Sequence, residues 1–123
     1  MMKIYFDGGC RPNPGPIDIA VVMRGQNLVR TSVAVGDSSE AEWLALLFAL
    51  EVAAGAGIED AIFIGDSVLV VEQARGRWKC RSVHLQPYLV EYKAHAAAFT
   101  RLRLRQVPRS KNLAGIVLDA RFR

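Results

Sequence analysis

A helix-forming segment followed by a short apolar run, residues 38–66, restricts this chain to few folds. Residues 38–57 combine helix formers with apolar side chains at helical spacing, and a glycine closes the run. Residues 61–66 are apolar and too few for a helix of ordinary length, and the helical pattern resumes over residues 67–74. A strand followed by a helix and a further strand predicts a crossover with parallel pairing.

Further elements are expected on both sides of this unit. Residues 3–7, 17–23 and 27–35 have the pattern of strands, with a hairpin turn between the last two. Residues 85–99 have helical spacing with a proline in the first turn, residues 101–107 alternate as a strand, and residues 111–120 predict a last helix. The predicted fold class is α/β, with a five-stranded mixed sheet of three antiparallel strands and then parallel strands, flanked by helices.

Length and composition limit the classes of protein to consider. The 123 residues suit one domain, residues 1–123, with one hydrophobic core. No apolar run is long enough to span a bilayer and no leader pattern opens the chain, so we expect a soluble cytoplasmic protein without a membrane partner. The two cysteines, Cys10 and Cys80, lack the spacing of a zinc site and predict neither zinc nor a disulfide.

Two segments of the chain are rich in basic residues. The formal charge is +4, which by itself is weak evidence for a polyanion partner. Arg101, Arg103 and Arg105 alternate with leucines and would share one strand face, where a solvated surface is the simpler interpretation. Around Trp78 the cations flank a flat aromatic ring, and this segment favours contact with nucleic acid.

Four carboxylates fall in or at the ends of the predicted elements: Asp7, Glu42, Asp66 and Asp119. A purely structural role would explain Glu42, Asp66 and Asp119, but it does not readily explain Asp7. Glu42 follows Ser39 at the spacing of a capping box, Asp66 stands where a helix N-cap would stand, and Asp119 could be a solvated residue of the last helix. Asp7 follows three apolar residues on a strand, where aspartate is depleted, so a partner should neutralise it.

Pairing of the first strand with the fourth would bring Asp7 and Asp66 together. Such carboxylates repel one another unless a cation or a proton lies between them. An oxygen-only ligand set favours a hard cation, Mg²⁺ first and Mn²⁺ second. Two such ions can activate water and stabilise the leaving oxygen of a phosphodiester, which is the chemistry of a nuclease.

Five segments in this order resemble the ribonuclease H type 1 family, in its short variant without the basic protrusion. They cover most of the chain: DGGCRPNPG, EAEWLALLFALE, IGDSVLVVEQ, RWKCRSVHLQPYLVE and VPRSKN. The resemblance implies a metal-dependent endoribonuclease that hydrolyses the RNA strand of RNA/DNA hybrids with two metal ions. It implies metal ligation and catalysis by Asp7, Glu42 and Asp66, with a fourth carboxylate from the last helix, for which Asp119 is the candidate.

The resemblance and the basic segments also indicate residues for nucleic-acid binding. The loop after the first strand would enter the minor groove of the hybrid, where 2′-hydroxyls distinguish RNA. For Cys10, a small buried packing residue is an equal alternative. The candidates are Gly8, Gly9, Cys10, Arg11, Asn13, Ser38, Ser39, Ser67, Trp78, Lys79, Arg109 and Asn112.

Two features limit this interpretation. The family's last aspartate corresponds to Ile116, and Asp119 lies three residues further along the helix. The loop before the last helix lacks a histidine, so Arg109 or Lys111 would contact phosphate in its place. His84 and His95 are assigned no role. Two alternative functions therefore stay open: a binding module that has lost turnover, and a nuclease of the same fold acting on another substrate such as double-stranded RNA. No protein partner is implied, and we expect a monomer.

Overall fold

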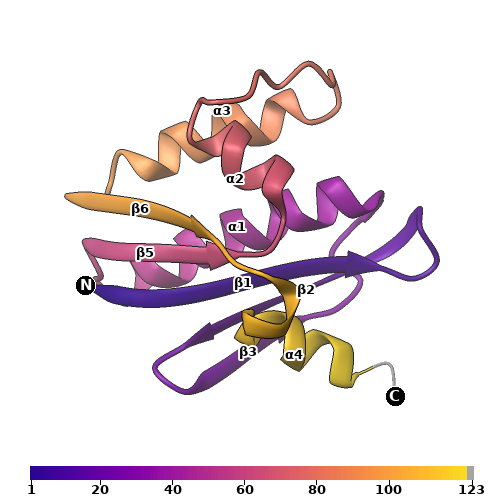
Figure 1. Cartoon of the computed structure of the whole chain (residues 1–123), viewed down its shortest axis with the longest axis horizontal. Coiled ribbons are helices and arrows are strands. Elements are labelled where there is room, and N and C mark those ends of the chain that lie inside the picture. The colour runs from indigo at the N-terminus through magenta and orange to yellow at the C-terminus, as the bar shows by residue number, and fades with distance from the viewer. Residues whose placement is uncertain (122–123) are drawn as a thin grey trace.

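The computed structural model describes residues 1–121 and contains one mixed β-sheet with helices on both faces (Figure 1). The strands lie in the order β3-β2-β1-β5-β6, and the short β4 pairs with β2 outside this path. The strands are β1 (Met2–Cys10), β2 (Gly15–Met23), β3 (Gln26–Arg30), β4 (Val35–Gly36), β5 (Asp60–Gly65) and β6 (Arg101–Gln106). The helices are α1 (Ser38–Gly55), α2 (Val68–Ala74), α3 (Gln86–Ala96) and α4 (Leu113–Ala120), with a 3-10 turn, η1, at Arg109–Lys111.

The pairing of the strands confirms the predicted mixed sheet. β1 pairs with β2, and β2 with β3, in antiparallel orientation. β1 pairs with β5, and β5 with β6, in parallel orientation, so the segment from β5 through α2 and α3 to β6 is the predicted crossover. The C-terminal end of β5 therefore lies beside β1, which places residues of both strands at the same part of the sheet.

Helices α1, α2 and α3 lie together on one face of the sheet, and α4 lies on the other (Figure 1). The larger part of the core fills the first of these layers around Trp43, whose indole N–H donates a buried hydrogen bond of 3.0 Å to Gln73 Oε1. Ala114 and Leu118 of α4 pack on Ala20 and Val22 of β2 in the smaller layer. Among residues 1–121, none of the helices combines the length and the apolar character needed to cross a membrane.

Two strand boundaries differ from the sequence-based expectation. β1 continues through Gly8 and Gly9 to Cys10, because these residues pair with Ile17–Ile19 of β2. The connecting loop is therefore confined to residues 11–14. The third strand ends at Arg30 and not at residue 35, because Ser32 has a positive φ of 50° and its N–H donates to Asp18 Oδ1 at 2.9 Å.

Candidate active site

Asp7, Glu42 and Asp66 meet at one place in the fold, and each comes from a different element. Asp7 lies inside β1 and is fully buried, Glu42 lies on the second turn of α1, and Asp66 follows β5. One carboxylate oxygen from each residue lies within 4.8 Å of those of the other two. The three predicted ligands therefore form one group, which we call the acidic cluster.

A glycine allows α1 to bring Glu42 to the sheet. A Cβ atom at Gly8 would overlap the backbone carbonyl of Ala41, so the helix approaches β1 closely only because residue 8 has no side chain. The Gly8 N–H donates a hydrogen bond of 2.7 Å to Glu42 Oε1. Gly8, predicted to bind nucleic acid, thus has a packing role and holds one of the three carboxylates, and its contact with nucleic acid stays a prediction.

Arg109 places a guanidinium group among the carboxylates. Its Nη1 donates to Asp7 Oδ1 at 2.5 Å and to Asp66 Oδ2 at 3.0 Å, and its Nη2 donates to Asp119 Oδ1 at 2.8 Å. The Arg109 side chain is 45% exposed, whereas that of Asp7 is fully buried. The arginine therefore enters from the surface and supplies positive charge to buried acids, a position that the sequence analysis did not anticipate.

Asp119 lies at the outer side of this arrangement. Its Oδ1 is shared by Arg109 and Arg11, the latter at 3.4 Å, and Asp119 is not part of the group of three. Ile116, at the family's position for the last aspartate, is half exposed. Asp119 thus reaches the acidic cluster only through Arg109.

Asn112 has a structural position that differs from its predicted contact with nucleic acid. It is fully buried, and its Nδ2 donates to Asp66 Oδ2 at 2.8 Å and to the Phe6 carbonyl at 3.0 Å. Its Oδ1 accepts from the Ala114 N–H at 3.1 Å and caps α4. Asn112 therefore orients Asp66 and has no surface to offer a ligand.

Burial and mutual repulsion determine the protonation of the cluster. Burial, followed by the charges of Asp7 and Asp66, raises the pKa of Glu42 well above its ordinary value. Burial also raises the pKa of Asp7, although Arg109 opposes that shift. Burial alone would lower the pKa of Arg109. The hydrogen bonds to Asp119 and Asp7 outweigh this effect, so the pKa of Arg109 is raised. Burial and mutual repulsion therefore favour the protonated forms of Glu42 and Asp7, and a positive charge beside them opposes this.

The donor set fits a divalent cation. Asp7 Oδ2 is buried and has no hydrogen-bond partner among residues 1–121, which is costly for a carboxylate oxygen. Three carboxylates without nitrogen or sulfur ligands match the preference of Mg²⁺ and Mn²⁺ for oxygen. These residues could hold such an ion.

The alternative capping roles considered for Glu42 and Asp66 are not adopted, because other residues cap both helices. The N-cap of α1 is Asp37, which forms a capping box with Glu40, so Ser39 and Glu42 do not form one. The N-cap of α2 is Ser67, whose Oγ accepts from the Val70 N–H at 3.2 Å, and this leaves Asp66 free for the cluster. The Ser67 hydroxyl, predicted to bind nucleic acid, is thus engaged within the protein.

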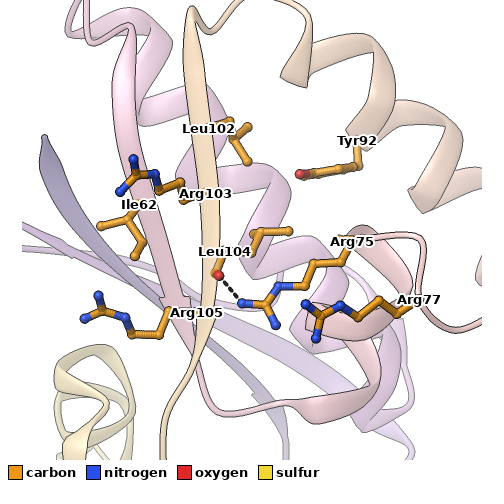
Figure 2. A pocket seen from close by; sticks show the side chains of 9 residues that line it. Ile62, Arg75, Arg77, Tyr92, Leu102, Arg103, Leu104 and Arg105 are labelled. Carbon is orange, nitrogen blue, oxygen red and sulfur yellow. Dashed lines mark hydrogen bonds between the residues drawn. The ribbon is translucent and has the colours of Figure 1, made fainter.

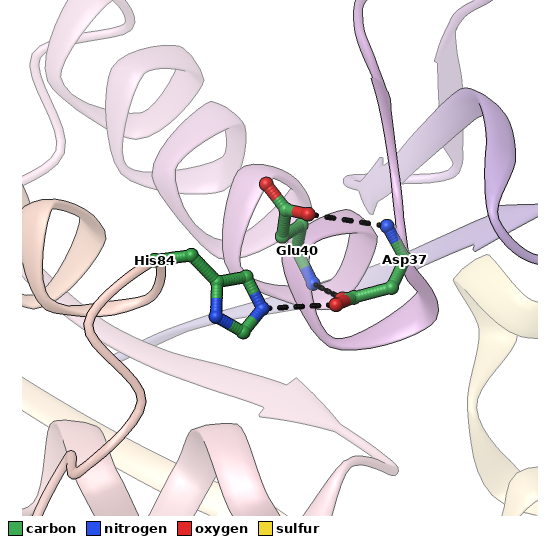
Figure 3. Close-up of side chains that lie close together, drawn as sticks. All are labelled: Asp37, Glu40 and His84. Atoms are coloured by element: carbon green, nitrogen blue, oxygen red, sulfur yellow. Dashed lines mark hydrogen bonds and ion pairs between the residues drawn. The ribbon is translucent and has the colours of Figure 1, made fainter.

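A second group of ligand-type side chains, Asp37, Glu40 and His84, lies at the start of α1 (Figure 3). His84 Nε2 lies 2.9 Å from Asp37 Oδ2, and the Tyr88 hydroxyl donates to Glu40 Oε2 at 3.0 Å. Hydrogen bonds within the protein thus account for this group. His84, which the sequence analysis left without a role, links the segment before α3 to the N-terminus of α1.

The remaining predicted contacts lie on the surface or next to it. Cys10 is buried, and its thiol donates to Asn13 Oδ1 at 3.4 Å. Asn13 in turn bonds Ser38, with its Nδ2 3.3 Å from Ser38 Oγ, and this joins the β1–β2 loop to α1. Gly9 lies in β1 and Ser39 in the first turn of α1, both half-buried, whereas Arg11, Trp78 and Lys79 are exposed.

Comparison with known proteins gives consistent matches over most of the chain. The family model described as reverse transcriptase-like matches residues 5–118. The bifunctional protein Rv2228c of Mycobacterium tuberculosis is 35% identical over 132 residues, a match that covers 97% of this chain and 36% of that protein. The chain thus spans about a third of the length of this relative.

Two solved structures are similar to this one. The crystal structure of RNase H1 from the archaeon Halobacterium salinarum superposes with a TM-score of 0.89 at 31% identity, covering 95% of this chain and 92% of that one. LC11-RNase H1, solved in complex with an RNA/DNA hybrid, has a TM-score of 0.84 at 27% identity, covering 92% of this chain and 89% of that one.

Proposed function

The chain belongs to the reverse transcriptase-like family of ribonuclease H type 1 domains, and from this premise we propose that it hydrolyses the RNA strand of RNA/DNA hybrids. The observation that carries the proposal is the acidic cluster of Asp7, Glu42 and Asp66, in which a buried oxygen of Asp7 lacks a partner. The solved hybrid complex of LC11-RNase H1 supports the choice of substrate. We propose that residues 1–123 act as one catalytic domain and as a monomer.

Asp7, Glu42 and Asp66 would together hold divalent metal, Mg²⁺ or Mn²⁺, through their carboxylate oxygens. When bound, such ions lower the pKa of water and stabilise the charge that develops on the phosphodiester oxygens. Asn112 orients Asp66 through its amide, and the Gly8 N–H orients Glu42. These two contacts fix the carboxylates before any ligand arrives, which reduces the reorganisation that binding requires.

Arg109 and Asp119 would act at the edge of this site. The Arg109 guanidinium balances the acids in the absence of metal, and its exposure allows it to turn towards a substrate phosphate when a divalent ion takes its place. Asp119 keeps that guanidinium close to the site through a bond of 2.8 Å. We propose Asp119 as the last-helix carboxylate of the second metal position.

The surface residues of the β1–β2 loop and of the segment after α2 would bind the hybrid. Asn13 and Ser38 are joined by hydrogen bonds, so the loop and the start of α1 present one polar surface beside the cluster. Arg11, Trp78 and Lys79 are exposed and suit phosphate and sugar contacts. Cys10 would support this surface through Asn13.

The test is cleavage of a hybrid whose RNA strand carries an end label, with Mg²⁺ and with Mn²⁺. We expect cleavage of RNA in the hybrid, and little cleavage of double-stranded RNA, single-stranded RNA or DNA. Asp7→Asn should lower kcat by roughly a thousandfold or more, because the buried carboxylate that holds the metal is lost. Its binding of the hybrid, measured by fluorescence anisotropy, should stay close to that of the wild type.

Asp60→Asn is the matched control, because it makes the same chemical change at the exposed start of β5. It should leave the cleavage rate unchanged. Metal-dependent cleavage by Asp7→Asn at the wild-type rate would refute the proposed site. Binding of the hybrid by the wild type without cleavage in either metal would favour a binding module instead.

A further inference from the structure

A groove lies along the free edge of β6 (Figure 2), and none of the three residues of the acidic cluster lines it. Its volume is about 580 Å³, and it is bordered by β6 together with the C-terminal end of α2 and with α3. β6 is the last strand of the sheet, so its outer edge pairs with no other strand among residues 1–121. We call this recess the β6 groove.

Four arginines line the β6 groove, two on each side of the strand. Arg103 and Arg105 extend on one side of β6, and Arg75 and Arg77 lie on the other side, which is also the side of Leu102, Leu104 and Tyr92 (Figure 2). Arg75 also donates a hydrogen bond to the Leu104 carbonyl on the strand edge. None of the nine residues that line the groove within residues 1–121 is acidic.

Little of this positive charge is neutralised inside the protein. Glu72 pairs with Arg75 at 3.1 Å and with Arg77 at 3.8 Å, which leaves one carboxylate for two guanidinium groups. Within the described part of the chain, no carboxylate lies within 4.0 Å of the guanidinium groups of Arg103 or Arg105. The groove therefore attracts a ligand with more than one negative charge.

The floor of the groove is apolar apart from one hydroxyl group. Leu102 and Leu104 line it together with Tyr92, whose side chain is 94% buried and whose hydroxyl points towards the groove (Figure 2). That hydroxyl makes no hydrogen bond within residues 1–121. Burial raises the pKa of Tyr92 to about 12, so the hydroxyl remains a donor at neutral pH. A ligand that fits this floor has an apolar face and an acceptor.

The groove ends next to the acidic cluster. Arg105 is followed by Gln106, whose Nε2 donates to the Asp66 carbonyl at 3.3 Å. The Val107 N–H donates to the Gly65 carbonyl at 3.0 Å, which joins the end of β6 to the end of β5. A chain of phosphates leaving the cluster along β6 would thus pass Arg105 and then Arg103, which are spaced by roughly 6.6 Å along the strand.

We propose that the β6 groove binds single-stranded nucleic acid that adjoins the hybrid. The arginines on the two sides of β6 match a phosphodiester backbone that crosses the strand edge, and the apolar floor with the Tyr92 hydroxyl on one side matches the face of a base or sugar and its acceptors. The inference rests on the proposed function for the position of the hybrid, but binding of a single strand is measured independently.

A single strand fits the groove better than a duplex does. A duplex presents phosphates on a convex surface and hides the faces of its bases in the stack, so it would leave the apolar floor uncovered. An unpaired nucleotide exposes both its phosphate and its base face. The combination of arginine side chains with a recessed apolar floor therefore selects the single strand.

The experiment compares a blunt hybrid with hybrids that carry a single-stranded DNA or RNA extension, using fluorescence anisotropy in EDTA to prevent cleavage. We expect the wild type to bind the extended hybrids roughly tenfold more tightly than the blunt one. Arg103→Ala combined with Arg105→Ala should abolish this preference and reduce the slope of log K against log salt by about 1.4.

Two further variants separate the groove from diffuse charge and from misfolding. Arg101→Ala removes the same charge from the same strand face outside the groove, and it should retain the preference. Tyr92→Phe removes only one hydroxyl and should weaken binding of the extended hybrids roughly three- to tenfold, with little effect on the blunt one. If the double variant fails to fold, Tyr92→Phe carries the test.

Equal affinity of the wild type for blunt and extended hybrids overturns the inference. A loss of the preference in Arg101→Ala as large as that in the double variant also overturns it, because binding would then be diffuse. Cleavage of the blunt hybrid without any preference for extensions refutes this inference alone. Preference for extensions without cleavage refutes the proposed hydrolysis alone.

Discussion

Arg109 is the residue with the largest effect on the charge balance of the site. Its guanidinium contacts Asp7, Asp66 and Asp119, which come from β1, the end of β5 and α4. Repulsion between these acids is reduced as long as the arginine stays among them. In sequence it belongs to a basic loop next to Lys111, which is typical of a solvated surface or a phosphate contact, and its position among acids had no local signal.

Replacing Arg109 with alanine should have opposite effects on the free and the metal-bound protein. In EDTA the free energy of unfolding should fall by on the order of 1 kcal/mol, because the acids lose a partly exposed counter-charge. The rise in melting temperature on adding Mg²⁺ should become larger, because a competing cation has been removed. Differential scanning calorimetry with and without Mg²⁺ measures both effects.

Arg11→Ala is the control, since it removes the same charge from a more exposed arginine that also pairs with Asp119, at 3.4 Å. This variant should change neither the free energy of unfolding in EDTA nor the rise in melting temperature on adding Mg²⁺ by a comparable amount. An unchanged response of Arg109→Ala to Mg²⁺ would show that the arginine and the metal do not compete for the same carboxylates.

At the scale of elements, periodicity predicted the helices and the crossover, whereas their ends depended on contacts distant in sequence. Asp37, Ser38 and Ser39 are all good N-cap residues, and local pattern does not choose between them. The structure selects Asp37, which is also bonded by His84, 47 residues away. In the same way β1 extends to Cys10 because β2 pairs with it, and a Gly-Gly pair alone indicates a turn.

The cap at Asp37 should make the stability of α1 depend on pH. The Glu40 N–H, and to a lesser degree His84, lowers the pKa of Asp37 below its ordinary value of 3.8. A carboxyl whose pKa is lower in the folded state stabilises the fold above the unfolded pKa, and this contribution is lost as the pH falls through the folded value. Asp37→Ala should therefore lower the free energy of unfolding by about 1 kcal/mol at neutral pH.

The difference between Asp37→Ala and the wild type should shrink below the ordinary pKa of 3.8 as Asp37 becomes protonated. Urea denaturation, followed by circular dichroism from neutral pH to below 3.8, measures this difference in the free energy of unfolding. Ser39→Ala should have a much smaller effect, because Ser39 is not the cap. If Ser39→Ala destabilised the protein as much as Asp37→Ala did, the assigned N-cap would be incorrect.

For the whole molecule, the sequence predicted which acids meet but not how their surroundings are arranged. Strand order alone brings Asp7 beside Asp66, and the close packing of α1 at Gly8 adds Glu42. The inward position of Asn112 and the outward position of Asp119 follow from the way α4 begins and packs on β1 and β2. That packing depends on the assembled sheet, so the spacing of residues in the chain could not predict it.

Because β1, α1 and the end of β5 each contribute a carboxylate to the acidic cluster, the proposed divalent site would exist only in the folded chain. A ligand that binds only the folded state stabilises it by about 2.7 kcal/mol at a concentration one hundred times its Kd. For a domain of this size, saturating Mg²⁺ should thus raise the melting temperature by roughly 10 °C over that in EDTA. Scanning calorimetry at increasing Mg²⁺ measures the shift, and Ca²⁺ offers a second oxygen-binding cation for comparison.

Variants of the acids then identify which of them bind the ion. Asp7→Asn should abolish the shift, because Asp7 contributes the buried oxygen that lacks a partner. Asp119→Asn should keep most of the shift, because Asp119 stands outside the group of three and is held by Arg109. A full shift in Asp7→Asn would mean that the ion binds elsewhere, and the acidic cluster would then have no part in metal binding.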